Sequence, residues 1–464
     1  MKNVDSVIPL LSVNYDKRWE EIYSDFSRFL AFESVSSEAE YKSEVLDCAN
    51  WLRDYLEAMG LKVSLWETSG HPVVFAVTRD FDASKPTVMI YNHYDVQPVS
   101  PLEAWASPPF KATIRDGEIF ARGAQDNKGQ CFYAITAIKH YLEQLGSLPV
   151  NIKLLIEGEE ETSSHGLSGL LASKREELCA DYLLILDVGF ESIDAPAVSL
   201  GLRGIATMTV NVRGSNVDLH SGTHGGIVYN PIHALVELLS KLRDESGRIA
   251  VPGFYDDVEA CSPEFFKEIS FEFDHERYCE KFGAKALGGE KSCSPKESAW
   301  LRPTIEINGI AGGYAGEGFK TVIPAVATAK ISCRLVPNQD PEKIKLLVKD
   351  FLEKNCSSAV EINVDLSPGG GKAVRTNSNS LVVRAAHRAF SEIMGVECQY
   401  VLEGASIPIV VDLTQATGAD VVLLGYGLPD DNIHAPNEHF GVKRFKYGYL
   451  TIARILELLG QEVA

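Results

Sequence analysis

The chain has 464 residues and a net charge of −20, with 45% hydrophobic and 23% charged residues, a composition typical of a globular protein with room for two or more domains. No apolar run approaches the roughly 20 residues of a transmembrane helix, and no lysine and arginine cluster offsets the acidic balance, so we expect neither a membrane protein nor a nucleic-acid-binding protein. Nine scattered cysteines without a Cys-x-x-Cys pair argue against a disulfide framework or a thiolate zinc site and, with no signal-peptide pattern at the start, predict a cytoplasmic protein.

The first part of the chain alternates helix and strand patterns. Apolar residues at helical spacing come first, and Gly60 is placed to cap that helix. The predicted elements are a helix at 45–59, strands at 61–66, 73–77 and 87–91, a helix at 128–145, and strands at 150–156 and 182–186. This alternation predicts an α/β domain with a mostly parallel central sheet flanked by helices.

A different pattern of predicted elements begins near residue 204. Its predicted elements are strands at 206–212, 304–308, 325–333 and 360–365 and a helix at 341–355. These favour a smaller α+β domain over 204–372, inserted into an α/β domain formed by 1–203 and 373–464, because a helix at 381–394 and a strand at 420–424 restore the α/β pattern. The glycine-rich segment 367–371 predicts a linker, since it lacks the first glycine and the hydroxyl residue of a phosphate-binding loop.

The apolar strand at 152–156 runs directly into four carboxylates within the segment 157–161. Carboxylates this close repel one another, and burial of unpaired charge is costly. A divalent cation is the usual compensation. A solvated acidic turn is the alternative that this run leaves open.

Other residues at strand ends could share such a cation. His93 and Asp95 face the same way on an extended chain, so His93 could bind a metal while Asp95 accepts a hydrogen bond from the other ring nitrogen; a structural histidine is the alternative. Asp126 precedes a helix, where it could cap the helix or bridge two cations.

Asp187 ends a strand at the same edge of the sheet, where it could be a metal ligand or a solvated strand end. His434 lies in a loop after another strand, where it could be a metal ligand or a surface residue. A set of histidines and carboxylates without cysteine suits zinc, or else manganese or cobalt.

Several segments together resemble the M20 metallopeptidases, and most closely the carnosinase and cytosolic non-specific dipeptidase branch. The resemblance covers nearly the whole chain from about residue 20. The phrases that carry it are His93-Tyr94-Asp95-Val96-Gln97-Pro98, Trp105-Ala106-Ser107-Pro108-Pro109-Phe110, Gly123-Ala124-Gln125-Asp126-Asn127-Lys128-Gly129, Asp218-Leu219-His220-Ser221-Gly222, Lys320-Thr321-Val322-Ile323-Pro324 and Arg334-Leu335-Val336-Pro337.

The resemblance implies a di-metal catalytic domain with an inserted lid and dimerisation domain. It implies that two divalent ions per subunit, with zinc favoured, are held by five residues: His93 and Asp187 for one ion, Glu161 and His434 for the other, and Asp126 as the bridge. The peptide from Asp126 to Asn127 is expected to be cis. Many relatives have Asp in place of Asn127, and because this residue is not a ligand we expect little change.

The resemblance also implies the catalytic roles. Glu160 would be the general base for a metal-bridging water, and Asp95 would orient His93. The downstream phrase that begins at Ser164 favours this register, while Glu159 as base with Glu160 as ligand is the alternative.

Substrate contacts are implied for the inserted domain and its surroundings. His220 would reach the active site of the partner subunit in a homodimer and stabilise the oxyanion. Arg334 would bind the substrate's terminal carboxylate, with Thr321 and Ser406 nearby.

The implied activity is hydrolysis of dipeptides or short peptides with a free carboxyl terminus. An N-acyl-amino-acid deacylase or desuccinylase of the same family is an alternative that the ligands cannot distinguish. A catalytically inactive binding protein is disfavoured, because every matching position is filled.

Overall fold

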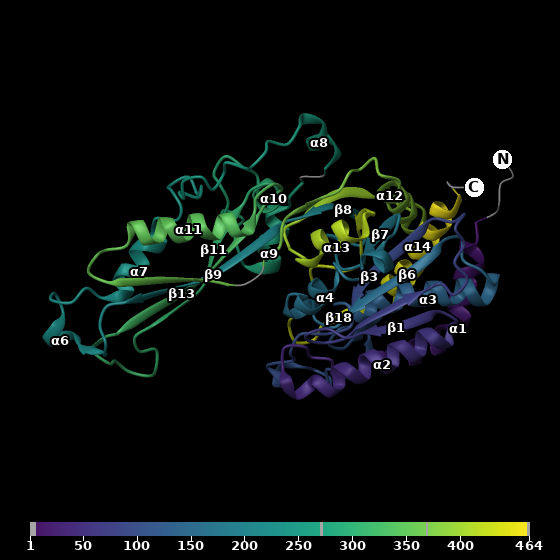
Figure 1. Ribbon diagram of the computed structural model, residues 1–464, viewed down its shortest axis with the longest axis horizontal. Helices are drawn as coiled ribbons and strands as arrows, with labels where there is room; N and C mark the ends of the chain where they lie inside the picture. The colour runs from purple at the N-terminus through teal and green to yellow at the C-terminus, as the bar shows by residue number, and fades with distance from the viewer. Residues whose placement is uncertain (1–5, 270–271, 368–369, 462–464) are drawn as a thin grey trace. The chain divides into compact units, whose positions relative to one another are not determined.

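The computed structural model describes residues 6–269, 272–367 and 370–461 (Figure 1). The chain divides into two compact units. Unit 1 comprises Met1–Leu200, Thr376–Val401 and Ile409–Ala464, and unit 2 comprises Gly201–Arg375 and Leu402–Pro408. Pro368 and Gly369 of the expected linker lie outside the described residues.

Unit 1 is an α/β domain built on a large mixed sheet flanked by helices (Figure 1). The strands of unit 1 and of its large sheet are β1 (Lys62–Trp66), β2 (Val73–Val77), β3 (Thr87–His93), β4 (Thr113–Arg115), β5 (Glu118–Phe120), β6 (Asn151–Glu157), β7 (Tyr182–Ile185), β8 (Ala197–Leu202), β15 (Val374–Arg375), β16 (Gln399–Glu403), β17 (Asp420–Leu423) and β18 (His439–Gly441). Of these, β8 and β16 continue across the boundary between the units, and β15 belongs to unit 2. The helices of unit 1 are α1 (Ile8–Leu30), α2 (Lys42–Ala58), α3 (Lys128–Leu145), α4 (His165–Leu170), α5 (Arg175–Leu178), α12 (Leu381–Met394), α13 (Ile409–Thr417) and α14 (Val442–Gln461).

The centre of the large sheet is parallel. Strand order is β1-β2-β6-β3-β7-β17-β8-β15, and β6, β3, β7 and β17 run in the same direction. Every residue of β3 is buried, as expected for a strand covered on both faces. The carboxyl ends of these strands therefore meet at one edge, where sites in α/β sheets gather.

Unit 2 contains a four-stranded antiparallel sheet in the order β11-β13-β9-β14. Its strands are β9 (Gly204–Arg213), β10 (Leu219–His220), β11 (Thr304–Gly312), β12 (Val322–Ile323), β13 (Val326–Leu335) and β14 (Glu361–Leu366), and its helices are α6 (Ser221–His224), α7 (Pro231–Ser240), α8 (Pro263–Glu268), α9 (His275–Phe282), α10 (Pro295–Trp300) and α11 (Pro341–Asn355). Buried and half-buried residues alternate along β9 and β13, and the buried side packs on α7 and α11. This alternation is the period-2 pattern of a sheet with one covered face.

Most predicted elements agree with the observed ones. The helices predicted at 128–145, 341–355 and 381–394 have the bounds of α3, α11 and α12, and β3 extends two residues beyond the predicted strand to include His93. The terminal helices α1 and α14 lie outside the predicted elements. Both were within reach of the periodicity argument, since α1 buries Leu11, Tyr15, Ile22 and Phe26, and α14 buries Phe445, Tyr449, Ile452 and Leu456, at helical spacing.

Two negative findings concern the described residues alone. Their helices include none that is both long and apolar enough to cross a membrane. All nine cysteines fall within this part of the chain, and none forms a disulfide.

Candidate metal centre

Two sets of three potential metal ligands lie at the carboxyl edge of the large sheet. The His93 group consists of His93, Glu160 and Asp187, and the His434 group consists of Asp126, Glu161 and His434. Within each group the ligand atoms lie within 4.8 Å of one another. Five of these six residues are the predicted metal ligands, and the sixth, Glu160, is the predicted base.

The ends of neighbouring strands bring the His93 group together. His93 is the last residue of β3, and it pairs with Glu157, the last residue of the parallel strand β6. Glu160 follows β6 in a 3₁₀ turn, and Asp187 lies two residues beyond β7. Adjacent parallel strands thus place side chains from three distant segments at one point.

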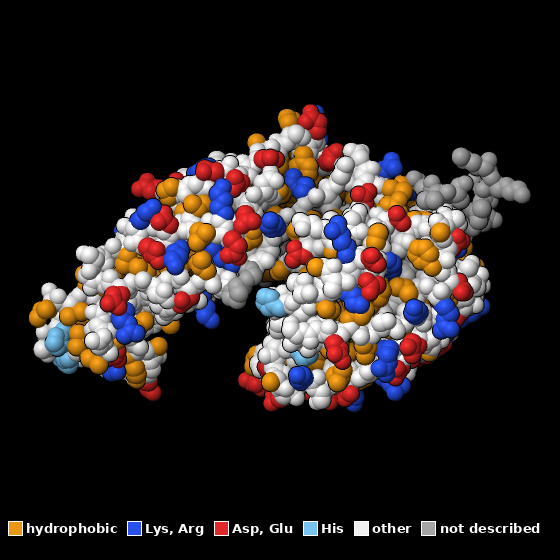
Figure 2. Space-filling model, in the orientation of Figure 1, with side chains coloured by type: hydrophobic (Ala, Val, Ile, Leu, Met, Phe, Trp, Pro, Cys, Tyr) orange, Lys and Arg blue, Asp and Glu red, His pale blue; other side chains and the backbone are white. Residues whose placement is uncertain are grey.

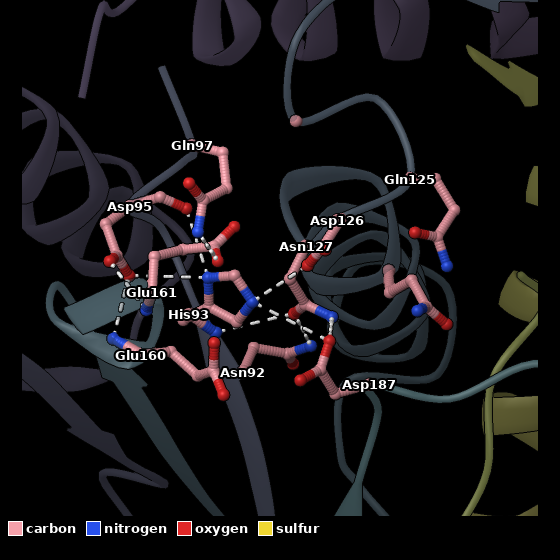
Figure 3. Close-up of polar contacts among 12 residues, drawn as sticks. Asn92, His93, Asp95, Gln97, Gln125, Asp126, Asn127, Glu160, Glu161 and Asp187 are labelled. Carbon is pink, nitrogen blue, oxygen red and sulfur yellow. Dashed lines mark hydrogen bonds and ion pairs between the residues drawn. The ribbon is translucent and has the colours of Figure 1, made fainter. Parts of the chain in front are cut away.

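Asp126 lies between the two histidines. Its Oδ1 is 3.1 Å from His93 Nε2 (Figure 3), and its Oδ2 is 3.1 Å from His434 Nε2. The peptide bond to Asn127 is cis, as expected. Asp126 does not cap α3, because the N-cap position is Asn127 and makes no side-chain cap hydrogen bond.

The two histidines differ in exposure. His93 is fully buried, whereas the His434 side chain is 52% exposed. His434 adopts a left-handed backbone with φ of 58°, a conformation that is uncommon for residues other than glycine and often found at functional sites. The pair of groups is therefore reached by solvent from the side of His434.

Asp95 connects His93 to the acidic run. Asp95 Oδ1 lies 3.3 Å from His93 Nδ1, and the Asp95 carbonyl oxygen lies 3.0 Å from the same nitrogen (Figure 3). Its two carboxylate oxygens also accept hydrogen bonds from the backbone N–H groups of Glu160 and Glu161 at 3.2 and 3.1 Å. The buried Asp95 carboxylate therefore fixes both the orientation of the His93 ring and the position of the main chain at Glu160 and Glu161.

The acidic run is a partly buried turn. Burial raises the pKa of Glu160 well above its usual range despite attraction to His93, and repulsion from Asp187 and Asp126 adds to the rise. Burial and repulsion from Asp126 raise the pKa of Glu161 to about 10. Carboxylates that resist ionisation to this degree are strongly destabilised when charged and unpaired, and cations relieve that destabilisation.

The other two acids of the run have different surroundings. Glu157 is buried and accepts hydrogen bonds from Tyr91 and Ser164 at 2.6 and 2.9 Å, and burial raises its pKa to about 8. The Glu159 carboxylate accepts a hydrogen bond from the backbone N–H of Gly166. Neither belongs to the two groups.

The donor set fits a divalent metal. It combines imidazole with carboxylate oxygens and contains no thiolate, a combination that suits zinc, manganese or cobalt. Glu161 Oε1 is buried and has no hydrogen-bond partner among the described residues. A buried oxygen without a partner is costly unless something binds it, and the Glu161 carboxylate belongs to the same group as His434.

Glu438 supports the loop that carries Asp126, and sequence reasoning did not identify it. Its carboxylate is fully buried and accepts hydrogen bonds from Arg122 Nη1 at 2.7 Å and from the backbone N–H groups of Gly123, Gln125 and Asp126 at 2.9, 3.0 and 3.0 Å. The sequence offers only its place four residues after His434, which does not reveal burial.

The four predicted substrate-contact residues all belong to unit 2. Arg334 Nη1 donates to Ser406 Oγ at 2.9 Å. Thr321 lies beside the His220 segment, because the backbone N–H of Ser221 donates to the Thr321 carbonyl oxygen at 3.0 Å. Figure 2 shows histidine side chains at the surface over α6, where His220 is exposed. Gly222 N–H donates to His220 Nδ1 at 3.1 Å, so the ring proton lies on Nε2.

Comparison with known proteins adds a family match. The sequence model of Peptidase family M20/M25/M40 matches residues 89–458. The Cys-Gly metallodipeptidase dug1 of Schizosaccharomyces pombe is 32% identical over 456 residues, which cover 93% of this chain and 94% of that protein.

Two further similarities are of the same extent. The human Beta-Ala-His dipeptidase is 31% identical over 464 residues, which cover 95% of this chain and 89% of that protein. The crystal structure of Sso-CP2, an M20 family metallo-carboxypeptidase from Sulfolobus solfataricus, is similar with a TM-score of 0.85 at 35% identity, covering 95% of this chain and 99% of that one.

Proposed function

Because the chain belongs to peptidase family M20/M25/M40, we propose that it is a metal-dependent dipeptidase that hydrolyses dipeptides or short peptides with a free carboxyl terminus. The names of its relatives, which are metallodipeptidases and a metallo-carboxypeptidase, support this substrate class. The observation that carries the proposal is Asp126, whose two oxygens each lie 3.1 Å from a histidine of a different group.

Two divalent ions would be held by the five predicted ligands: His93 and Asp187 for one, Glu161 and His434 for the other, with Asp126 shared. Zinc is favoured, with manganese or cobalt as alternatives, because the donors are nitrogen and oxygen. When bound, such ions lower the pKa of a coordinated water and polarise the scissile carbonyl.

Glu160 acts as the general base and acid in this scheme. Its carboxylate accepts the proton of the attacking water and delivers it to the leaving amine. The hydrogen bond from its backbone N–H to Asp95 keeps the carboxylate in place beside His93.

Unit 2 supplies substrate contacts. Burial lowers the pKa of Arg334, and the guanidinium has no ion pair with a carboxylate in the described part of the chain, so its planar donors are available to the substrate's terminal carboxylate. Ser406 and Thr321 assist this recognition. His220, with its proton on Nε2, donates to the oxyanion.

We place His220 at the active site of a partner subunit, in a homodimer formed through unit 2. Mixing two inactive variants, Glu160→Ala and His220→Ala, would then restore activity, because a hybrid dimer has one site with both residues intact. A fully active monomer in sedimentation, or mixtures that stay inactive although hybrid dimers form, would refute action in trans.

The central experiment replaces Glu160 with alanine. We expect hydrolysis of a dipeptide to fall by about 10³-fold or more, near the upper part of the range for a general acid–base group, while two ions remain bound. Glu159→Ala is the matched control and should retain most activity. If Glu159→Ala abolishes hydrolysis and Glu160→Ala loses metal, the alternative register is correct, and normal turnover in Glu160→Ala would eliminate Glu160 as base.

A substrate panel separates the two amidohydrolase classes. Dipeptides should be hydrolysed far faster than N-acyl-amino acids if the terminal contacts are those of a peptidase. Preference for acyl or succinyl substrates would instead support the deacylase alternative.

A further inference from the structure

Each of the two ligand groups contains a carboxylate held by a side-chain amide. Asn127 Nδ2 donates to Asp187 Oδ1 at 2.7 Å in the His93 group. Gln97 Nε2 donates to Glu161 Oε2 at 2.7 Å in the His434 group. The same contact thus occurs once in each group, made by two residues from unrelated segments that are not themselves potential ligands.

The orientation of the Asn127 amide is determined at both ends. Nδ2 also donates to the Leu186 carbonyl oxygen at 2.6 Å, while Oδ1 accepts from Asn92 Nδ2 at 2.6 Å and from the backbone N–H of His93 at 3.4 Å (Figure 3). Reversal of the amide would set like groups against each other at every contact. Its donor therefore faces Asp187, and one side chain touches two members of the His93 group.

Gln97 leaves one oxygen of Glu161 available. Glu161 Oε2 receives the amide and lies 3.4 Å from His434 Nε2, while Oε1 is buried without a hydrogen-bond partner among the described residues. A carboxylate with one oxygen restrained presents the other in a single direction.

Neutral amides are suited to this task. A lysine or arginine at either place would repel cations bound by the neighbouring carboxylates, and an apolar side chain would leave those carboxylates free to rotate. An amide restrains the oxygen without adding charge. At position 127 an aspartate would set a second carboxylate against Asp187, whereas asparagine donates a hydrogen bond to it.

We propose that Asn127 and Gln97 are positioning residues, each of which sets the affinity of one ion site: Asn127 for the His93 group and Gln97 for the His434 group. The proposal rests on the di-metal function above. Loss of a partner that orients a metal ligand typically weakens metal affinity by about 10- to 100-fold, so each single loss should weaken one of the two sites.

The test uses Asn127→Leu and Gln97→Met, which remove the amide with little change of size and no change of charge. Zinc is titrated against a chromophoric chelator that resolves two binding steps in the unaltered protein. Each variant should weaken one step by about 10- to 100-fold. In an Asp187→Ala background, Asn127→Leu should have no further effect, whereas Gln97→Met should still weaken the remaining step.

Thermal unfolding of the zinc-free proteins separates positioning from folding. Positioning predicts a smaller rise of the midpoint on zinc addition in both variants, and for Gln97→Met a zinc-free midpoint near that of the unaltered protein. The zinc-free midpoint of Asn127→Leu should fall, because the buried amide also bonds Leu186, Asn92 and His93. The proposal would be overturned if both variants bind zinc as tightly as the unaltered protein, or if each variant weakens both zinc-binding steps equally. If Asn127→Leu does not fold, Gln97→Met decides, because Gln97 is partly exposed. If the unaltered protein itself binds fewer than two zinc ions, the di-metal function fails first.

Discussion

Replacement of Glu438 by glutamine should destabilise unit 1 strongly, although only one atom changes. Oε2 of Glu438 accepts from Arg122 Nη1 and from Gly123 N–H, and Oε1 accepts from Gln125 and Asp126 N–H. A glutamine can offer an oxygen to one pair alone, so its NH₂ group must face donors at the other.

The energetic effect follows from burial. Arg122 is 1% exposed. Its Nη2 donates to the Pro98 carbonyl oxygen at 2.9 Å, and its Nε has no partner among the described residues. Removal of one partner from a buried ion pair costs about 3–5 kcal/mol. We therefore expect Glu438→Gln to lose about 4 kcal/mol, which lowers the unfolding midpoint of a domain this large by roughly 10 °C.

Glu118→Gln provides the matched control. Glu118 also pairs with an arginine, Arg444, at 3.0 Å, but its side chain is 34% exposed, and Arg444 keeps two 2.6 Å contacts with Asp431. Glu118→Gln should lower the free energy of unfolding by less than about 1 kcal/mol. Calorimetry and zinc titration of both variants provide the assay, since displacement of Asp126 should also weaken metal binding. Equal, small losses in the two variants would refute the assignment of Glu438 as the anchor of the Asp126 loop.

Three further outcomes are expected. Arg334→Ala should raise KM for a dipeptide about 10- to 100-fold, since a hydrogen bond to a charged group contributes about 1.5–3 kcal/mol, and an unchanged KM would remove its role as carboxylate clamp. Burial, assisted by Arg18, lowers the pKa of His140 from 6.5 to about 4, so between these pH values the unfolded chain binds a proton that the folded chain does not. The free energy of unfolding should therefore keep its full value above pH 6.5 and fall by about 2 kcal/mol by pH 5. Denaturation of His140→Gln at the same pH values should not show this fall. Chelation should lower the unfolding midpoint, because an ion at 100 times its Kd contributes about 2.7 kcal/mol; calorimetry that finds equal midpoints with and without metal would contradict the electrostatic argument for the acidic turn.

Sequence reasoning predicted elements well where the information is local. The apolar periodicities of α3, α11 and α12 depend on neighbours three and four residues away, and their predicted bounds agree with the structure. It did not identify α14, although Phe445, Tyr449, Ile452 and Leu456 recur there at helical spacing.

For the candidate site, too, some features could be predicted from the sequence and others could not. The types of ligand and their places at strand ends are legible in the sequence, because parallel strands deliver their carboxyl ends to one edge. Which ligands share an ion was expected from a family resemblance, since periodicity does not specify that Glu160 lies with His93 while Glu161 lies with His434.

The residues that hold the ligands required the tertiary structure. Glu438 bonds to the backbone of Asp126 across 312 positions of sequence, and the amides of Gln97 and Asn127 reach carboxylates 64 and 60 positions away. The sequence by itself determined the α/β class, the inserted domain as a prediction and the chemical identity of the ligands. Only the tertiary structure decided their partners, because a buried hydrogen bond depends on strand register and on the exclusion of water, and neither is a property of a residue and its sequence neighbours.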